Sequence, residues 1–224
     1  MRAEVLPSVE ARASLLRAVG EPARLHVVDL LSVSDRTPGD LRDLTGMEWN
    51  LLGFHLGVLE ESGIVERRRS EGDGRRRYVR LVPGVVKYLP PLSVGPEVRF
   101  PLFVCTRNSA RSQFAAAFWQ KATGLPAVSA GSHPADSVDR LARTVAAEYG
   151  LDLSESRPRG YDEVSRDPDA VISVCDRALE GGLPMAVSHR HWSVPDPAAS
   201  NRKAFQLAFA DIADRIDRLA KVSA

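Results

Sequence analysis

Residues 102–113 of this chain have the sequence LFVCTRNSARSQ, and this stretch decides the fold of the second half of the molecule. An apolar run ends at Cys105, five residues follow, and Arg111 and Ser112 open a stretch with helical character. When such a loop curls over the N-terminus of a helix, its backbone N–H groups point inward and form a cradle for an anion. The stretch therefore predicts a strand, an oxyanion-binding loop and a helix, in that order.

The residue types in this loop indicate chemistry at Cys105. The positive field of the loop favours the thiolate, which is the nucleophilic form of cysteine. Arg111 can hold two oxygens of an oxyanion at once, and the hydroxyl of Ser112 can donate a hydrogen bond to the sulfur. The alternative is a structural role, because a lone cysteine commonly acts as a small buried hydrophobic residue.

Strands and helices alternate on both sides of this loop. Apolar runs predict strands over residues 98–104, 127–130 and 170–174, and helical patterns cover residues 112–123, 138–149 and 202–221. This alternation is typical of an α/β domain, with a parallel sheet flanked by helices. Ligands of such sheets bind beyond the carboxyl ends of the strands, and Cys105 lies at one of those ends.

The first half of the chain follows a different pattern. Helical spacing of apolar residues predicts helices over residues 8–19, 22–31, 37–44 and 48–61, and strands over residues 64–69 and 77–81, joined by a glycine-containing turn. Helix-turn-helix followed by a hairpin predicts an α+β winged helix-turn-helix domain. Residues 67–80 contain seven arginines and two acidic residues, a local charge of +5 that places a basic edge on this domain.

Composition separates the two halves. Prolines at positions 83, 90, 91, 96 and 101 interrupt the chain between them. We expect an N-terminal domain over residues 1–90, a stiff Pro-rich linker over residues 91–98, and a C-terminal domain over residues 99–224.

The chain of 224 residues is 44% apolar and 26% charged, with a formal net charge of +1, which is an ordinary globular composition. No apolar run approaches the roughly 20 residues that cross a bilayer, and residues 1–10 lack the apolar core of a secretory signal. We therefore expect a cytoplasmic protein with no membrane association. Two cysteines, Cys105 and Cys175, are too few for a disulfide framework or a thiolate zinc site, so no bound cofactor or metal is expected.

Residues 12–89 resemble the ArsR family of dimeric winged-helix metalloregulators. The resemblance rests on LLRAVGEPARL at residues 15–25, on HLGVLEESGIV at residues 55–65, and on the arginine-rich segment that ends at Tyr78. It implies a homodimer that binds a DNA operator, with residues 48–59 in the major groove and the arginine-rich hairpin near phosphates or the minor groove. The DNA-binding candidates are Glu48, Trp49, Asn50, Gly53, His55, Arg75, Arg76 and Arg77.

The first half departs from this family in two ways. Many of these repressors sense a metal or arsenite through thiolates, whereas residues 1–92 contain no cysteine. Serine hydroxyls are poor ligands for soft ions, so a soft-metalloid sensor is not expected there. His26, His55 and Asp29 could suggest a harder metal site, but packing or a DNA contact is favoured for His55. Trp49, Gly53 and Phe54 stand where the family favours small polar residues, which leaves the bases that are read undetermined.

Residues 99–221 resemble the low-molecular-weight protein tyrosine phosphatase fold, and in particular its arsenate reductase branch. The resemblance rests on residues 105–113 together with SAGS at residues 129–132 and HWSVPDP at residues 191–197. It implies a nucleophile at Cys105, an oxyanion clamp at Arg111 and a general acid at Asp196, with Asn108 and Ser112 supporting the loop and the thiolate. The predicted oxyanion-binding loop comprises Thr106, Arg107, Asn108, Ser109, Ala110 and Arg111.

A second motif, VCDRALEGGLP at residues 174–184, bears on the electron donor. Arsenate reductases of this fold that use thioredoxin carry two cysteines there, and this chain has Cys175 at the first position and Gly182 at the second. Either Cys175 attacks the thiol–arsenate adduct and an external redoxin or small thiol reduces the resulting disulfide, or a small thiol such as mycothiol attacks the adduct directly. The second route is weakly favoured, because residues 110 and 113–117 resemble those of mycothiol-dependent members of the family. A buried, inert Cys175 is nearly as well supported.

Three functions follow from these resemblances. The first is a DNA-binding transcriptional regulator fused to an arsenate reductase that depends on an external thiol. The second is a regulator whose C-terminal domain binds an oxyanion or arsenite without turnover. The third is a phosphatase acting on phosphotyrosine or small phosphoesters through the same loop.

Overall fold

The computed structural model describes residues 8–89, 92, 95–185, 187–198 and 200–223. The chain divides into two compact units, Met1–Arg68 with Tyr78–Ser93, and Arg69–Arg77 with Val94–Ala224. The linker expected over residues 91–98 falls partly on residues 91, 93 and 94, which lie outside the described ranges, so that linker stays a prediction.

Four helices form most of the first unit: α1 (Val9–Val19), α2 (Pro22–Val33), α3 (Pro38–Thr45) and α4 (Trp49–Glu61). Local chemistry fixes their ends. The hydroxyl of Ser8 and the carboxylate of Glu21 accept the free N–H groups that open α1 and α2. Thr37 and Asp40 form a reciprocal capping box at the start of α3.

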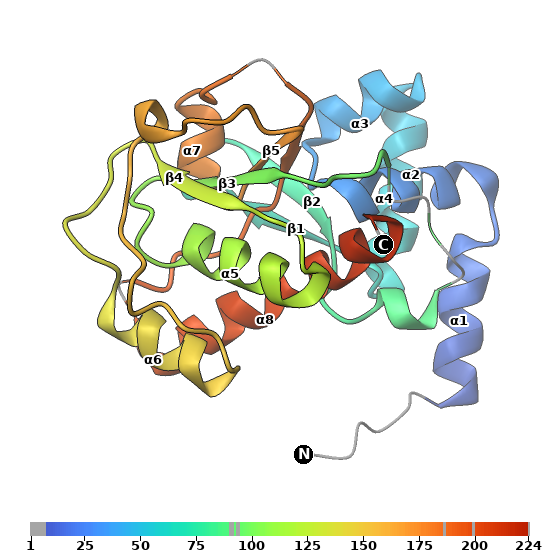
Figure 1. The fold of residues 1–224 in the computed structure, drawn as a ribbon. Coiled ribbons are helices and arrows are strands. Elements are labelled where there is room, and N and C mark those ends of the chain that lie inside the picture. The colour runs from blue at the N-terminus through green and yellow to red at the C-terminus, as the bar shows by residue number, and fades with distance from the viewer. Residues whose placement is uncertain (1–7, 90–91, 93–94, 186, 199, 224) are drawn as a thin grey trace. The chain divides into compact units, whose positions relative to one another are not determined.

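A two-stranded hairpin follows these helices, formed by β1 (Val65–Arg69) and β2 (Arg77–Leu81) (Figure 1). Backbone hydrogen bonds between Arg36 and Val79, at 3.1 and 2.7 Å, attach β2 to the segment between α2 and α3. Fully buried aliphatic side chains from three helices and β2 form the core, among them Val27, Val28, Leu41, Leu59 and Val79. A short 3₁₀ helix, η1 (Val86–Tyr88), comes after the hairpin.

The second unit is built on a parallel four-stranded sheet of order β4-β3-β5-β6. Its strands are β3 (Pro101–Cys105), β4 (Val128–Gly131), β5 (Ala170–Ser173) and β6 (His189–His191). The parallel sheet flanked by helices confirms the α/β class predicted for this half. Because β3 is central, Cys105 at its carboxyl end has a neighbouring strand on each side.

Helices cover both faces of this sheet. Helices α5 (Arg111–Thr123), α6 (Arg140–Glu148) and α8 (Arg202–Ser223) lie together on one face, and the short α7 (Asp176–Glu180) lies on the other (Figure 1). Phe114 of α5 packs edge-on against Phe209 of α8, with ring centroids 5.5 Å apart. Another 3₁₀ helix, η2 (Tyr161–Glu163), precedes β5.

The structure differs from the sequence prediction at three elements. Strand β3 begins at Pro101 and not at Val98, because the Asp169 carboxylate accepts the N–H groups of Arg99 and Phe100 and takes them out of the sheet. Helix α7 and strand β6 were not predicted. Strand β6 has the sequence His-Arg-His, which has no apolar signal, although Arg190 and His191 are buried in the fold.

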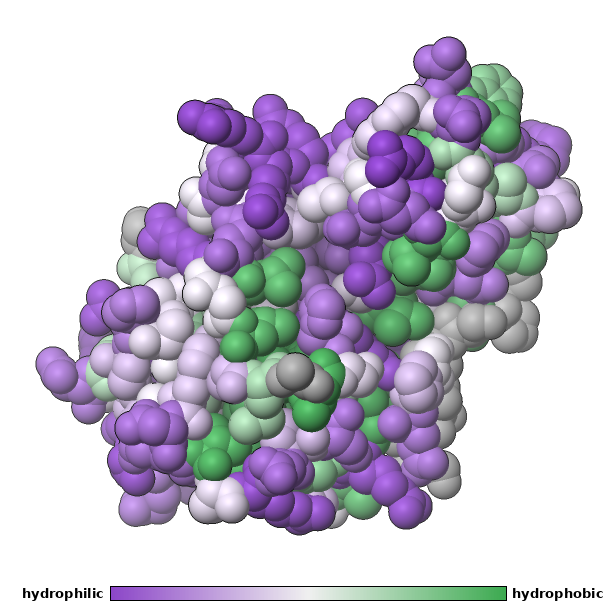
Figure 2. Space-filling model, turned by 90° about the horizontal axis from the view of Figure 1, so that it is seen from above, coloured by the Kyte–Doolittle hydropathy of each residue, from purple (hydrophilic) through white to green (hydrophobic). Residues whose placement is uncertain are grey.

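Hydrophilic side chains dominate the face of the molecule drawn in Figure 2, and the hydrophobic residues on it form small, separate patches. Among the described residues, no helix combines the length and the apolar character that a membrane span requires.

Candidate active site

The loop between β3 and α5 wraps around the sulfur of Cys105. The backbone N–H of Asn108 donates to Cys105 Sγ at 3.2 Å, and Ser112 Oγ lies 3.0 Å from the same sulfur. Cys105 is 3% exposed, while Asn108 and Ser112 are completely buried. Polar groups of the loop therefore contact the sulfur, although Cys105 also belongs to the buried hydrophobic core of this unit.

Carbonyl groups of the loop point away from this sulfur and are held by the segment of residues 132–139. The acceptor and donor pairs are Cys105 O with Ser132 N (3.3 Å), Thr106 O with His133 N (2.8 Å), Arg107 O with Ala135 N (3.0 Å) and Ser109 O with Asp139 N (2.9 Å). Because C=O and N–H of one planar trans peptide point in opposite directions, these bonds turn the intervening N–H groups inward. The loop thus has the inward-facing amides that an oxyanion cradle needs.

Asn108 fixes the shape of the loop. Its φ of 48° lies in the left-handed region, which asparagine tolerates better than most residues. The side-chain amide donates to Ser112 Oγ at 2.8 Å, and its oxygen accepts from Gln113 Nε2 at 3.1 Å and from the backbone N–H of Arg159 at 3.0 Å. The amide therefore joins the loop to the start of α5 and to the chain beyond α6.

Gly131, at the end of β4, gives the loop its space. It lies opposite Cys105 in the parallel register. A Cβ atom at this position would lie 2.9 Å from Asn108 N and 2.7 Å from Thr106 O, both of which are backbone atoms that cannot rotate away. A glycine is required here because the loop backbone rests directly on β4.

Arg111 lies at the first position of α5 with its side chain only 6% exposed. Its Nη1 donates to Val194 O at 2.9 Å, and its Nη2 lies 3.1 Å from Asp196 Oδ2. Burial opposes the charge, but the nearby Cys175, Cys105, Asp196 and Glu71 outweigh it and raise the pKa of Arg111. The guanidinium therefore stays cationic beside the loop.

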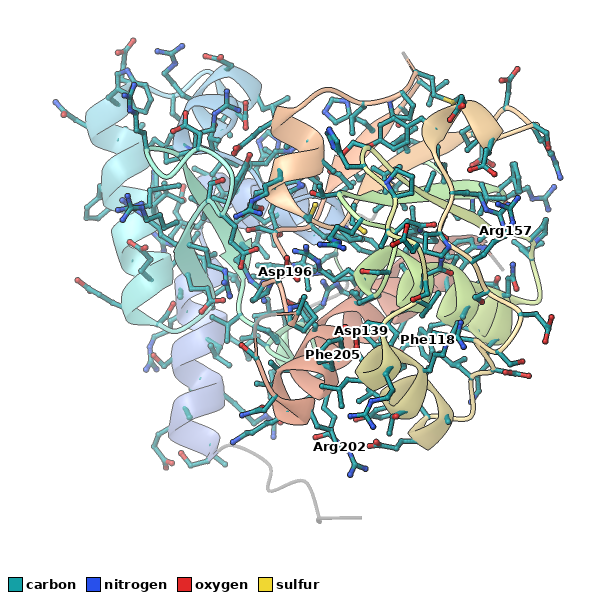
Figure 3. All side chains as sticks on the ribbon, turned by 90° about the vertical axis from the view of Figure 1, so that its left-hand side faces the viewer. Phe118, Asp139, Arg157, Asp196, Arg202 and Phe205 are labelled. Carbon is teal, nitrogen blue, oxygen red and sulfur yellow. The ribbon has the colours of Figure 1, made fainter. Side chains whose placement is uncertain are left out.

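Asp196 is 40% exposed and occupies the loop between β6 and α8, where Figure 3 labels it. Its Oδ1 accepts the N–H of Ala198 at 3.1 Å, and prolines precede and follow it. An exposed carboxyl on a short, stiff loop next to Arg111 has the access to solvent and the proximity that a proton donor requires.

Cys175 follows β5 and caps α7, so both cysteines lie at the carboxyl ends of adjacent strands. Cys175 is 1% exposed, and its sulfur lies 3.5 Å from Thr106 Oγ1 and accepts the N–H of Ala178 at 3.4 Å. Burial raises the pKa of the Cys175 thiol; Arg111 opposes that rise and the Cys105 sulfur adds to it. Cys175 is therefore a protonated thiol next to the loop.

The other predicted loop residues differ in exposure. Ala110 is buried and Thr106 and Ser109 are half-buried, while Arg107 is exposed and lines an open pocket with Asp136 and Arg140. Arg107 therefore adds positive charge outside the ring of amides.

Sequence reasoning missed Glu71 as a residue of this site. The turn of residues 69–77 belongs to the second unit, and its Glu71 Oε2 lies 3.5 Å from Arg111 Nη1. The backbone N–H of Asp196 donates to Glu71 Oε1 at 2.9 Å. No signal in the sequence marks this contact, because Glu71 is forty positions before Arg111 and has the composition of an ordinary turn.

A buried polar chain next to Cys175 was also missed. Ser173 Oγ lies 2.9 Å from His191 Nδ1, and His191 Nε2 lies 3.1 Å from Asp176 Oδ1. Burial opposes the charge on Asp176, but hydrogen bonds from His191, the backbone N–H of Glu71 and Ser193 lower its pKa. The sequence could have suggested this chain only through its polar residues at strand ends.

The DNA-binding candidates fall into two sets. Most are exposed: Glu48, Trp49, Asn50 and Gly53 at the start of α4, and Arg75, Arg76 and Arg77 in the turn before β2. His55 is 6% exposed and its Nδ1 faces Glu21 Oε2 at 3.6 Å. This burial fits the packing alternative for His55, and its contact with DNA stays a prediction.

Within the ranges that the structure describes, no group of three or more His, Cys, Asp or Glu side chains is arranged to hold a metal ion.

Comparison with known proteins adds independent information. Residues 101–223 match the family model described as low molecular weight phosphotyrosine protein phosphatase. An arsenate reductase of Brevibacillus brevis is 32% identical over 124 residues, covering 53% of this chain and 92% of the relative. Arsenate reductase 2 of Staphylococcus epidermidis is 31% identical over 119 residues, covering 51% of this chain and 91% of the relative. These matches support an arsenate reductase of the low-molecular-weight phosphatase fold.

A solved structure supports the same fold. The tyrosine phosphatase Wzb from Escherichia coli K30, in complex with sulphate, aligns with a TM-score of 0.50 at 22% identity, covering 55% of this chain and 97% of that chain.

The role of Gly131 can be tested by Gly131→Ala. The added methyl group has to displace the loop backbone, so we expect phosphate to bind about tenfold more weakly or worse, by isothermal titration calorimetry. Ser132→Ala, one residue further on, is the control and should bind as the wild type does. Unchanged affinity in Gly131→Ala, with the fold intact by circular dichroism, would contradict the account of the loop.

Proposed function

Because the chain belongs to the low molecular weight phosphotyrosine protein phosphatase family, we propose that its second unit is a thiol-dependent arsenate reductase with Cys105 as nucleophile. The observation that carries the proposal is the polar enclosure of Cys105 Sγ by Asn108 N–H and Ser112 Oγ, next to a buried Arg111. The similarity to arsenate reductases at about a third identity supports the choice of substrate.

The first step is attack of the Cys105 thiolate on the arsenic atom of arsenate. The inward amides and Arg111 hold the equatorial oxygens, whose negative charge they stabilise without reorganising. A hydroxyl group of arsenate takes a proton from Asp196, the As–O bond breaks, and the group leaves as water. The product is a covalent adduct in which arsenic is still pentavalent.

The second step reduces arsenic. A second thiol attacks the sulfur of Cys105, the S–As bond breaks, and its electron pair stays on arsenic, which leaves as arsenite. Two thiols are oxidised to one disulfide as arsenic passes from the +5 to the +3 state. An external thiol reductant, mycothiol or a redoxin, then returns the enzyme to its starting form.

Two candidates remain for the second thiol: Cys175 and a small external thiol. The position of Cys175 beside Thr106 supports an internal attack followed by external reduction. Its burial and raised pKa favour direct attack by a small external thiol, because a protonated, enclosed sulfur is a poor nucleophile. Gly182 stands where a second resolving cysteine would be needed for a relay confined to the protein.

The reductase proposal is tested by supplying arsenate with mycothiol or with a redoxin system and measuring arsenite. Cys105→Ser is expected to abolish turnover, since no other thiolate lies in the cradle. Cys175→Ser separates the two routes: activity survives if a small thiol attacks the adduct directly and is lost if Cys175 attacks. Arsenite formation that persists in Cys105→Ser would contradict the proposal.

A phosphatase is the second candidate, favoured by the family match and by the presence of Asp196 beside Arg111. The same cradle would hold a phosphoester, and Asp196 would protonate its leaving group. Assaying an aryl phosphate and arsenate side by side decides between them. We expect arsenate reduction to exceed aryl phosphate hydrolysis in kcat/KM, and the reverse order would make the phosphatase the principal activity.

For residues 1–90, we propose a winged-helix DNA-binding regulator that acts as a homodimer. Support comes from the exposed residues at the start of α4 and from the exposed Arg75, Arg76 and Arg77. If the second unit bound an oxyanion or arsenite without turnover, it would serve this regulator as a sensor; loss of arsenite formation with retained oxyanion binding would identify that case.

The DNA proposal is tested by replacing Arg75, Arg76 and Arg77 together with alanine. Each arginine that contacts a phosphate steepens the salt dependence of binding by about one unit of the log–log slope. We expect the slope, measured by fluorescence anisotropy with the operator, to fall by about two to three. Replacement of the exposed Arg140, Arg143 and Arg157 of the second unit is the charge-matched control. An unchanged slope in the first variant would argue against the hairpin as a DNA contact.

A further inference from the structure

The turn of residues 70–73 is held against helix α7, within the second unit, by four polar contacts. Ser70 Oγ donates to Glu180 Oε1 at 2.8 Å, and the backbone N–H of Asp73 donates to the other oxygen of Glu180. The N–H of Glu71 donates to Asp176 Oδ2 at 2.8 Å, and Arg177 Nε donates to Glu71 O at 3.0 Å. Helix α7 thus supplies carboxylate acceptors for the Ser70 hydroxyl and for two backbone N–H groups of the turn. It also supplies a donor for the carbonyl of Glu71.

The contacts between this turn and helix α7 involve charged groups and leave little space. Hydrogen bonds lower the pKa of Asp176, so it is an anionic acceptor for the Glu71 N–H. Residue 72 is a glycine, and a Cβ there would clash with the Glu180 carboxylate, which already accepts from Ser70 and Asp73. A larger residue would displace the acceptor on which the turn depends.

These contacts place the Glu71 side chain next to Arg111 and the loop that carries Asp196. Its two oxygens accept the same N–H, that of Asp196, at 2.9 and 3.1 Å, and Oε2 lies 3.5 Å from Arg111 Nη1. The longer distance makes the guanidinium contact mainly an electrostatic one. A carboxylate carries negative charge on two oxygens and so resembles one edge of arsenate or phosphate.

We propose that Glu71 is an intramolecular ligand of the oxyanion site, which competes with the substrate for Arg111 and for the Asp196 loop. The inference rests on the proposed function in taking an oxyanion as the substrate of this site. Arg111 already faces Asp196 at 3.1 Å and Glu71 at 3.5 Å, so an oxyanion that binds the same guanidinium would be repelled by the Glu71 carboxylate beside it. The oxyanion therefore has to displace the turn, and the apparent affinity falls by the fraction of molecules in which the site is free.

The proposal is tested with the full-length protein and inorganic phosphate. Glu71→Gln keeps the shape of the side chain and removes its charge. We expect its dissociation constant for phosphate, by isothermal titration calorimetry, to be about three- to tenfold lower than that of the wild type. The KM for an aryl phosphate or for arsenate should fall by a similar factor.

Asp73→Asn is the matched control. It removes an equal charge from the same turn, but its carboxylate faces the Arg75 N–H at 3.0 Å and Arg76 at 3.8 Å. Phosphate should bind to Asp73→Asn as it does to the wild type. An equal gain in both variants would mean that general charge, and not occupation of the site, controls affinity, and would overturn the proposal.

Hydrogen exchange supplies a second readout that a passive surface contact would not move. In the wild type, saturating phosphate should speed exchange of the Glu71 and Asp73 amides. When the turn moves away from helix α7, the hydrogen bonds from these amides to Asp176 and Glu180 break. Phosphate binding with equal affinity in wild type and Glu71→Gln, and no change in exchange, overturns this inference and leaves the enzyme proposal intact. Absence of phosphate binding in every variant overturns both.

Discussion

The outward direction of the carbonyl groups in the loop of residues 105–111 is the constraint on which the site depends. The segment of residues 132–139 fixes that direction, because four of its backbone N–H groups donate hydrogen bonds to these carbonyl groups. Since each peptide is planar, the intervening N–H groups point to the opposite side of the loop, where the Asn108 N–H donates to the sulfur of Cys105. The loop can adopt this shape because Gly131 leaves room beneath it and Asn108 accepts a positive φ.

Charge at the site is arranged around one buried cation. Arg111 is surrounded by groups that are or can become anionic: Cys105, Cys175, Asp196 and Glu71. This arrangement suits a site that must bind a multiply charged oxyanion, because the guanidinium stays cationic whatever the state of its neighbours. It also explains why a turn that carries a carboxylate can occupy the same position. That turn precedes Arg75, Arg76 and Arg77, so the segments proposed to contact substrate groups and DNA are adjacent in the chain.

The sequence allowed the central part of this arrangement to be predicted. The spacing from Cys105 to Arg111 and the alternation of strands and helices indicated the parallel sheet, the loop and its place at a strand end, because these are local or periodic features. Strand β6 was missed because His-Arg-His acquires its burial only by pairing with β5. Glu71 was missed for a similar reason, because it acts through a contact with a segment distant in sequence, which leaves no local pattern. The SAGS motif at residues 129–132 contains Gly131, but only the pairing of β3 with β4 shows that the missing side chain leaves room for the loop.

We propose that Cys105 is the reactive nucleophile of an oxyanion cradle, whereas Cys175 is an enclosed thiol. The most direct measurement is the rate of iodoacetamide alkylation of each cysteine at neutral pH, followed by peptide mass spectrometry with and without phosphate. The account predicts that Cys105 reacts first and that phosphate slows its reaction, while Cys175 reacts slowly in both conditions. Alkylation of Cys105 no faster than that of Cys175, or at a rate that phosphate leaves unchanged, would contradict it.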